Sequence, residues 1–195
     1  MKSVACIVEG DGEVAALPVL LRRICEWKTP EIPTYIPPPI RVYKDRFLNR
    51  EGEFRRHLLL AAAKCGESGW VLVVLDADDD CPKARGAEIL ARAQIVIPHR
   101  RIAVVLANRE YEAWFIAAAR SLHGVRSFKL ETTHSDGDAE LPRNAKGWMS
   151  KRMGGAGYNE TTDQPAFSAQ LDLQQAFDAS RSFRKLCSEW EKHQS

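Results

Sequence analysis

The sequence predicts an α/β protein with a central parallel sheet flanked by helices and a mostly helical C-terminal extension. Over residues 1–123, apolar runs of strand length alternate with segments of helical periodicity. One run, "GWVLVVLDADDD", has the unbroken hydrophobicity of a central parallel strand. From residue 124 the chain is polar and Gly-rich before helical periodicity returns. We therefore expect an α/β domain over residues 1–123 and a helical extension over residues 124–195 packed on it.

The first elements are two strand-and-helix units. "SVACIVEG" predicts a buried strand over residues 3–9, and apolar residues at helical spacing from Val14 to Trp27 predict a helix. Pro18 is unfavourable inside that helix and predicts either a kink or a start near Ala16. The proline-rich stretch 29–43 allows at best an edge strand. "EGEFRRHLLLAAAKCG" then predicts an amphipathic helix closed by Gly66.

The remaining elements continue the alternation and then change character. The central strand is followed by a predicted helix over 83–94, a strand over 101–108 and a helix over 109–122 that starts at once. Residues 131–144 are polar and loop-like, and residues 153–164 are Gly-rich. Beyond residue 124, only residues 171–192 have clear helical periodicity.

Composition excludes several classes of protein. The 28 basic and 26 acidic residues nearly cancel, so bulk charge predicts neither nucleic-acid nor membrane-surface binding, and partners must be argued from local clusters. Five scattered cysteines without a C-x-x-C pair predict no disulfide framework and no structural zinc site, which favours a reducing cytoplasm. The absence of a signal-peptide core and of any 18-residue apolar stretch predicts a cytoplasmic protein without a membrane span.

Acidic residues follow three of the predicted strands. They are Glu9 and Glu13 after the first strand, Asp76, Asp78 and Asp80 after the third, and Glu110 and Glu112 after the fourth. Parallel α/β sheets place their sites at the carboxyl ends of the strands. Alternate residues of an extended segment share a face, so the three aspartates project together if the extended conformation continues past the strand.

A divalent cation is the simplest explanation for such a cluster. Carboxylates that lie close together raise one another's pKa unless a cation neutralises them. Oxygen ligands without His or Cys suit Mg²⁺ or Mn²⁺. Such a site suits phosphoryl transfer, in which one metal activates a water and a second stabilises the leaving oxygen.

Simpler roles for the same acids compete with this interpretation. Acids at strand ends are often solvated loop residues, and Asp79 or Asp80 is placed to cap a helix beginning near Pro82. Glu13 is placed to complement the dipole of the first helix. Glu110 and Glu112 suit an exposed helix start.

Two nucleotide-binding motifs also compete. Gly10, Gly12 and Ala15 fit the G-x-G-x-x-A dinucleotide fingerprint, but the acids around them oppose a pyrophosphate, and only Glu31 is available for the ribose. The D-x-D pair also fits a nucleotide-sugar transferase, which leaves the Glu-Gly turn after the first strand unexplained. No P-loop sequence is present, so ATP hydrolysis by a P-loop is excluded.

The motif order resembles a known domain. "IVEGDGE" followed by "VVLDADDD" is similar to the Toprim domain of topoisomerases, bacterial primases and the overcoming-lysogenization-defect nucleases, and the E-x-x-x-E spacing is closest to the last group. Nearly the whole chain resembles a bacterial family named only as domain of unknown function 4276, usually regarded as Toprim-like. The segments that carry this resemblance are "VEGDGEVAALPVLLRRI", "DADDD", "ANREYEAWF", "YNETTDQPAF" and "SRSFRKL". It implies a Toprim-like fold and metal-dependent phosphodiester chemistry.

The resemblance assigns roles to particular residues. Glu9 matches the Toprim glutamate, a metal ligand or acid/base in cleaving members, and Asp76 and Asp78 match the D-x-D metal ligands. Glu13 matches the second glutamate of the nuclease group. To these we add Asp80 and Glu112 as candidates for a second metal. The expected cofactor is Mg²⁺ or Mn²⁺.

Contact with nucleic acid must come from basic clusters, most of which are expected to be solvated faces. The candidates are Arg22/Arg23, Arg55/Arg56/His57, His99/Arg100/Arg101, Lys146 to Arg152, and Arg181/Arg184/Lys185. We favour the fourth, because Lys146, Lys151 and the "GGAG" segment suit closure over a phosphate, which makes the two lysines catalytic candidates. Trp148 within it suits either stacking on a base or packing in the core.

The sequence thus predicts a Mg²⁺- or Mn²⁺-dependent nuclease or related phosphodiester-cleaving enzyme. Topoisomerase and primase activities are not expected, because the partner domains they need are missing. The family resemblance implies a partner ATPase in a bacterial defence system. The alternative is a catalytically inactive binding or regulatory subunit of such a complex.

Overall fold

A parallel sheet forms the centre of the molecule. The computed structural model describes residues 2–131, 139–155 and 157–194, so the predicted loop over 131–144 lies partly outside the described residues. The strands run in the order β2-β1-β4-β5, and β3 also pairs with β1. Their bounds are β1 (Lys2–Val8), β2 (Thr34–Tyr35), β3 (Ile40–Arg41), β4 (Trp70–Asp76) and β5 (Arg101–Ala107). The expected α/β class with a parallel sheet flanked by helices is confirmed.

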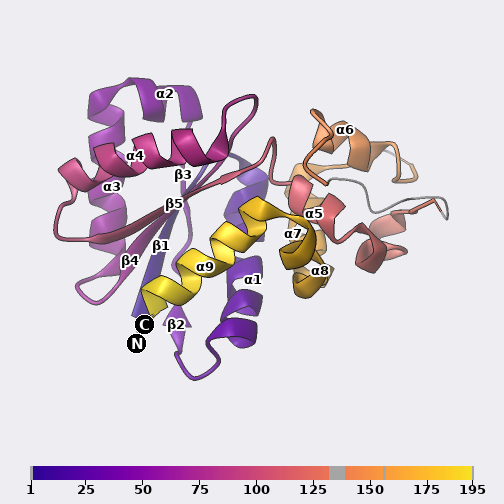
Figure 1. Cartoon of the computed structure of the whole chain (residues 1–195), viewed down its shortest axis with the longest axis horizontal. Coiled ribbons are helices and arrows are strands. Elements are labelled where there is room, and N and C mark those ends of the chain that lie inside the picture. The colour runs from indigo at the N-terminus through magenta and orange to yellow at the C-terminus, as the bar shows by residue number, and fades with distance from the viewer. Residues whose placement is uncertain (1, 132–138, 156, 195) are drawn as a thin grey trace.

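Helices cover both faces of this sheet (Figure 1). On one face lie α2 (Lys44–Asn49), α3 (Glu51–Cys65) and α4 (Pro82–Val96), and on the other lie α1 (Asp11–Lys28) and α9 (Arg181–Gln194). Alternate residues of β1 serve the two faces, as the period of a strand requires. Ala5 and Ile7 belong to the core under α3 and α4, whereas Val4, Cys6 and Val8 belong to the core shared with α1.

The C-terminal part is helical, as expected, and packs against the same core. Its helices are α6 (Ala145–Ser150), α7 (Glu160–Gln170), α8 (Leu173–Ala179) and α9, with a short 3-10 turn over Val125–Ser127. Helix α5 (Ala113–Ala117) and a 3-10 turn over Ala119–Leu122 come directly before this part. Phe167 of α7 and Trp190 of α9 are fully buried in one cluster with Val4 of β1, so the hydrophobic core continues across residue 123. Within the described residues, no helix has both the length and the apolar character needed to cross a membrane.

The first helix differs from its prediction. Helix α1 begins at Asp11 and continues past Pro18 to Lys28, so the predicted start near Ala16 is wrong. Proline removes one backbone hydrogen bond from a helix interior. Leu17 and Leu20, on either side of that defect, are completely buried, and tertiary packing of this kind supplies most helical stability in proteins.

The predicted helix over 109–122 is wrong in its start and its length. Arg109 has a left-handed backbone with φ of +67°, so the chain turns after β5 and α5 begins only at Ala113. The sequence also gave no prediction of α6 and α7. The sequence nevertheless contains a capping signal for α7, since Asn159 is a residue type favoured at helix N-caps. In the structure its side chain accepts hydrogen bonds from the N–H groups of Thr161 and Thr162.

Close packing of α7 on α1 leads to a stability prediction. A Cβ atom at Gly12 would lie 2.9 Å from the Glu160 carbonyl oxygen and closer still to Gln164 Oε1. Gly12→Ala is therefore expected to lower the free energy of unfolding by about 2 kcal/mol, measured by urea titration. Gly52→Ala is the matched control, because nothing lies within 4 Å of the added atom. It should stabilise α3 by about 0.5 kcal/mol, and equal effects of the two variants would contradict the packing argument.

Candidate active site

A pocket of about 520 Å³ opens where β1 and β4 end. Parallel strands bring their carboxyl ends to one edge, so residues distant in the sequence meet there. Four of the predicted acids line it, together with one predicted lysine and a segment that follows β3. The lining residues are Glu9, Gly10, Glu13, Arg41, Val42, Tyr43, Lys44, Asp45, Arg46, Asp76, Asp78, Lys146 and Glu160.

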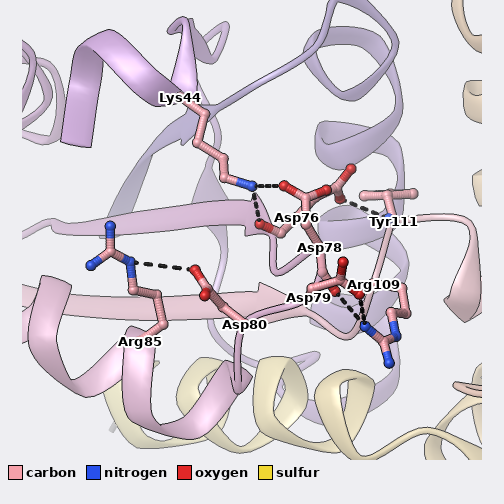
Figure 2. A network of polar contacts seen from close by, with 8 residues as sticks. All are labelled: Lys44, Asp76, Asp78, Asp79, Asp80, Arg85, Arg109 and Tyr111. Carbon is pink, nitrogen blue, oxygen red and sulfur yellow. Dashed lines mark hydrogen bonds and ion pairs between the residues drawn. The ribbon is translucent and has the colours of Figure 1, made fainter. Parts of the chain in front are cut away.

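The four aspartates of "DADDD" have four different environments (Figure 2). Asp78 has a left-handed backbone with φ of +50°, and the Asp80 N–H bonds back to the Ala77 carbonyl. The extended conformation therefore ends with the strand, and the condition under which Asp76, Asp78 and Asp80 would share a face is not met. Asp79 Oδ1 lies 2.6 Å from Arg109 Nη1. None of the four caps α4, whose N-cap is Cys81.

Asp76 is the most deeply placed of the four. It ends β4, is 9% exposed, and accepts a hydrogen bond of 2.8 Å from the Tyr111 N–H through Oδ1. Burial, then the charges of Glu112 and Glu13, raise the pKa of Asp76 well above its usual value. Ionised Asp76 therefore needs compensation by positive charge.

Glu9, in the turn between β1 and α1, and Glu13, in the first turn of α1, both line the pocket. Glu9 Oε2 is buried and has no hydrogen-bond partner, and burial raises the pKa of this carboxyl against the opposing effect of Lys44. Glu13 is 6% exposed and accepts a hydrogen bond from the Gly10 N–H. Burial raises the pKa of Glu13 as well. Two carboxyls thus line the same pocket, and one of them, Glu9, has a buried oxygen without a hydrogen-bond partner.

Two lysines supply positive charge to this cluster. Lys44 Nζ donates 2.9 Å to the Asp76 carbonyl oxygen and also contacts the Asp78 carboxylate (Figure 2). Lys146 Nζ lies 3.1 Å from Glu160 Oε1. Burial alone would lower the pKa of Lys146, but Glu112, Asp76 and Glu160 raise it above its usual value. Both lysines therefore stay charged beside the acids.

Glu112 lies beside the pocket and is completely buried. Its Oε1 accepts hydrogen bonds of 2.8 Å from the Tyr158 hydroxyl and 3.1 Å from Gln164 Nε2, whereas Oε2 has no partner. Burial raises the pKa of Glu112 to about 7, despite the opposing effects of Lys146 and Tyr158. This carboxyl is therefore poised to exchange its proton near neutral pH.

The raised pKa of Glu112 predicts a pH-dependent stability. Below pH 4.5, its usual pKa, the group is protonated in both folded and unfolded chains, and between pH 4.5 and about 7 only the folded chain keeps the proton. Stability is therefore lost as the pH rises through this window. The free energy of unfolding of Glu112→Gln minus that of wild type, measured in EDTA, should be about 2 kcal/mol larger at pH 8 than at pH 5. Urea titrations of the two proteins measure this difference at each pH. A difference in unfolding free energy that does not change with pH would contradict the prediction.

Besides Glu112, two predicted site residues, Asp80 and Lys151, are not part of the pocket lining. Asp80 Oδ2 is 3.7 Å from Arg85 Nε on α4 (Figure 2). Lys151 lines a second pocket of about 390 Å³, with Pro142, Asn144, Gly147, Trp148 and Arg152. There the Arg152 guanidinium lies 3.7 Å from the centre of the Trp148 ring. Lys146 and Lys151, expected to act together, thus face different pockets.

Several of the predicted basic clusters contain residues that bind the chain's own backbone. Arg23 donates to the carbonyl oxygens of Ser168 and Leu171 at 3.0 and 2.8 Å. Arg100 donates to the Gly66 carbonyl oxygen at 2.7 Å, and Arg184 to that of Phe177 at 2.7 Å. These guanidinium groups satisfy carbonyls where helices end, which is a role in folding.

Sequence reasoning missed the basic side of the pocket. Arg41, Tyr43, Lys44 and Arg46 all line it, and Glu160 was not singled out either. The signal was present, because "RVYKDR" places three cationic residues and a tyrosine within residues 41–46. This signal is weakened because residues 41–43 belong to the proline-rich stretch 29–43, which predicts at best an edge strand.

The start of α1 does not suit a dinucleotide. Gly10 donates its N–H to the Glu13 carboxylate, so this donor is already used. The face of Gly12 is covered by Glu160 and Gln164 of α7, which leaves no room for a pyrophosphate against it. The helix packing accounts for Gly12 without a ligand.

The acids suit a divalent cation in chemistry but not in their present spacing. They offer only oxygen ligands, and Glu9 Oε2 and Glu112 Oε2 lack partners. Yet no three acidic, histidine or cysteine side chains in the described parts of the chain converge closely enough to hold a metal ion. The Lys44 ammonium contacts Asp78, so a cation bound there would compete with Lys44 for that carboxylate.

The family of this chain follows from its sequence match. The model of the family described as Domain of unknown function (DUF4276) matches residues 8–191, and the chain belongs to this family. The match spans the turn after β1, the aspartates after β4 and the C-terminal helices. Neither the search of curated proteins nor that of solved structures found a match.

Proposed function

We propose that this protein is a Toprim-like, Mg²⁺- or Mn²⁺-dependent nuclease. The observation that carries the proposal is the meeting of Glu9, Glu13, Asp76 and Asp78 in one pocket at the strand ends. Glu13 and Asp76 are buried and Glu9 is partly buried, and like charges placed in this way are unfavourable unless something neutralises them. The similarity of the Glu-Gly and D-x-D motifs to Toprim domains supports the same interpretation.

In this proposal the residues around the pocket have different roles. Glu9, Glu13, Asp76 and Asp78 would hold the cation, which would supply a more acidic water and stabilise charge on the phosphate. Lys146 would hold a phosphate oxygen, because its ammonium stays charged and lines the pocket. Glu112 would hold Tyr158 and Gln164 in place behind the acids. Asp80 and Lys151 are not needed for this arrangement.

Cleavage of labelled DNA and RNA oligonucleotides tests this proposal. Wild-type protein should cleave at least one of them with Mg²⁺ or Mn²⁺ and not with EDTA. Asp78→Asn should lower the rate by about 100-fold. Asp79→Asn is the matched control, since that side chain pairs with Arg109 and does not line the pocket. Equal rates for the two variants would contradict the proposed site.

A catalytically inactive regulatory or binding subunit is the second candidate. It is favoured by the contact of Lys44 with Asp78, since an ammonium group can neutralise the carboxylates without a metal. Metal-independent activity of the intact complex, unchanged in Asp78→Asn, would support this role. The setting we propose for either function is the bacterial cytoplasm, beside a partner ATPase of a defence system.

A further inference from the structure

The segment that enters α2 holds an aromatic side chain at the mouth of the pocket. Tyr43 is 62% exposed and lines the pocket with Arg41 and Arg46. A tyrosine this exposed gains little from packing, and its ring is accessible to a partner outside the chain. We call Arg41, Tyr43 and Arg46 the aromatic rim.

The backbone of the aromatic rim is fixed by the sheet and the core. Strand β3 pairs with β1, and the Val42 N–H donates 2.8 Å to the Val8 carbonyl oxygen. Val42 is 2% exposed and Phe47 is fully buried, so the residues on either side of Tyr43 are anchored. Strand alternation then turns Arg41 and Tyr43 outward together.

The two arginines make the rim suitable for a polyanion with flat groups. Their guanidinium carbons lie 4.9 Å (Arg41) and 5.3 Å (Arg46) from the centre of the Tyr43 ring. Arginine pairs with phosphate and also stacks on planar rings. An aromatic ring flanked by arginines is a typical platform for an unpaired base, which stacks on it while the cations contact the backbone.

We propose that the aromatic rim binds an unpaired nucleotide and so selects single-stranded nucleic acid for the carboxylate pocket. This inference rests on the proposed function, because it names the substrate strand of the same pocket. In a duplex the flat faces of the bases are stacked on one another and are closed to Tyr43. The rim also places positive charge at the entrance of an acidic pocket that would otherwise repel phosphates.

Fluorescence anisotropy of a short labelled oligodeoxythymidine tests the inference in EDTA, where no cleavage is expected. Wild-type protein should bind the single strand more tightly than a hairpin duplex. Tyr43→Ala should weaken binding by about tenfold, whereas Tyr43→Phe should stay within about twofold of wild type. Arg46→Gln should reduce the slope of log affinity against log salt by about 0.7.

Tyr35→Ala is the matched control, because Tyr35 is likewise exposed, at 51%, but does not line the pocket. The inference is overturned if Tyr43→Ala and Tyr35→Ala bind alike, if the duplex binds as well as the single strand, or if wild-type protein binds neither. Tyr43-dependent binding without metal-dependent cleavage would retain the rim and reject the nuclease. Metal-dependent cleavage that is unaffected by Tyr43→Ala would retain the nuclease and reject the rim.

Discussion

Glu9→Gln is expected to weaken Mn²⁺ binding by at least about 100-fold and to raise the melting temperature measured in EDTA. Both effects have one cause. Glu9 Oε2 is buried without a partner, and burial raises the pKa of the group, so its charge is unfavourable in the metal-free fold. Glutamine removes the charge and keeps the shape of the side chain. A side chain whose charge costs stability in this way is typical of a functional site.

Thermal unfolding with and without Mn²⁺ measures both effects in one experiment. Wild-type protein should gain stability from Mn²⁺, and Glu9→Gln should not. Glu88→Gln is the control, since that exposed acid pairs with Arg85 on α4. This variant should leave unchanged both the melting temperature in EDTA and the stabilisation by Mn²⁺. A lower melting temperature of Glu9→Gln in EDTA would mean that Glu9 has a structural role instead.

Lys146→Met should destabilise the protein by about 2 kcal/mol at pH 8 and by less at pH 5. Lys146 compensates Glu112, Asp76 and Glu160, and its removal leaves only Lys44, of the lysines described in the pocket lining, to offset the charges of the buried carboxyls Glu112 and Asp76. Its side chain is 33% exposed, so solvent screening reduces the loss below that of a fully buried pair. At pH 5 the raised pKa values of Asp76 and Glu112 let these groups protonate, which relieves the imbalance.

Lys151→Met is the matched control for this prediction. Lys151 directly follows α6, the helix that carries Lys146, but lines the second pocket, away from these acids. In urea titrations at pH 8 and pH 5, the free energy of unfolding of Lys151→Met should differ little from that of wild type. In the cleavage assay, Lys146→Met should also lose about 100-fold in rate while Lys151→Met keeps its rate. Equal losses would favour the sequence-based expectation that the two lysines act together.

The fold was predictable where hydrophobic pattern alone decides it. The uninterrupted apolar run of β4 and the strand-helix alternation identified the parallel sheet, because burial on both faces leaves a strong signal. Helices α6 and α7 were not predictable from periodicity, since short polar helices are stabilised by tertiary packing and by caps such as Asn159. The start of α5 depended on the left-handed backbone at Arg109, which no pattern of apolar residues encodes.

The site was predictable as far as the sheet determines it. Glu9 follows β1 and Asp76 ends the adjacent parallel strand β4, so their meeting results from the topology of the sheet. The separation of Asp80 from the pocket depends on the turn at Asp78, which ends the strand geometry. The residues Arg41, Tyr43 and Lys44 stand out in "RVYKDR", but their place at the pocket depends on the pairing of β3 with β1, and a two-residue strand gives almost no signal of its pairing.

Isothermal titration of Mn²⁺ into wild-type protein, Asp76→Asn and Asp79→Asn tests the central claim most directly. Asparagine at position 76 keeps an oxygen for the Tyr111 N–H, and circular dichroism would verify that all three proteins are folded. We expect saturable binding by wild type and Asp79→Asn, and its loss in Asp76→Asn. Absence of binding by the folded wild type, or equal binding by all three proteins, would contradict a metal site built on the ends of β1 and β4.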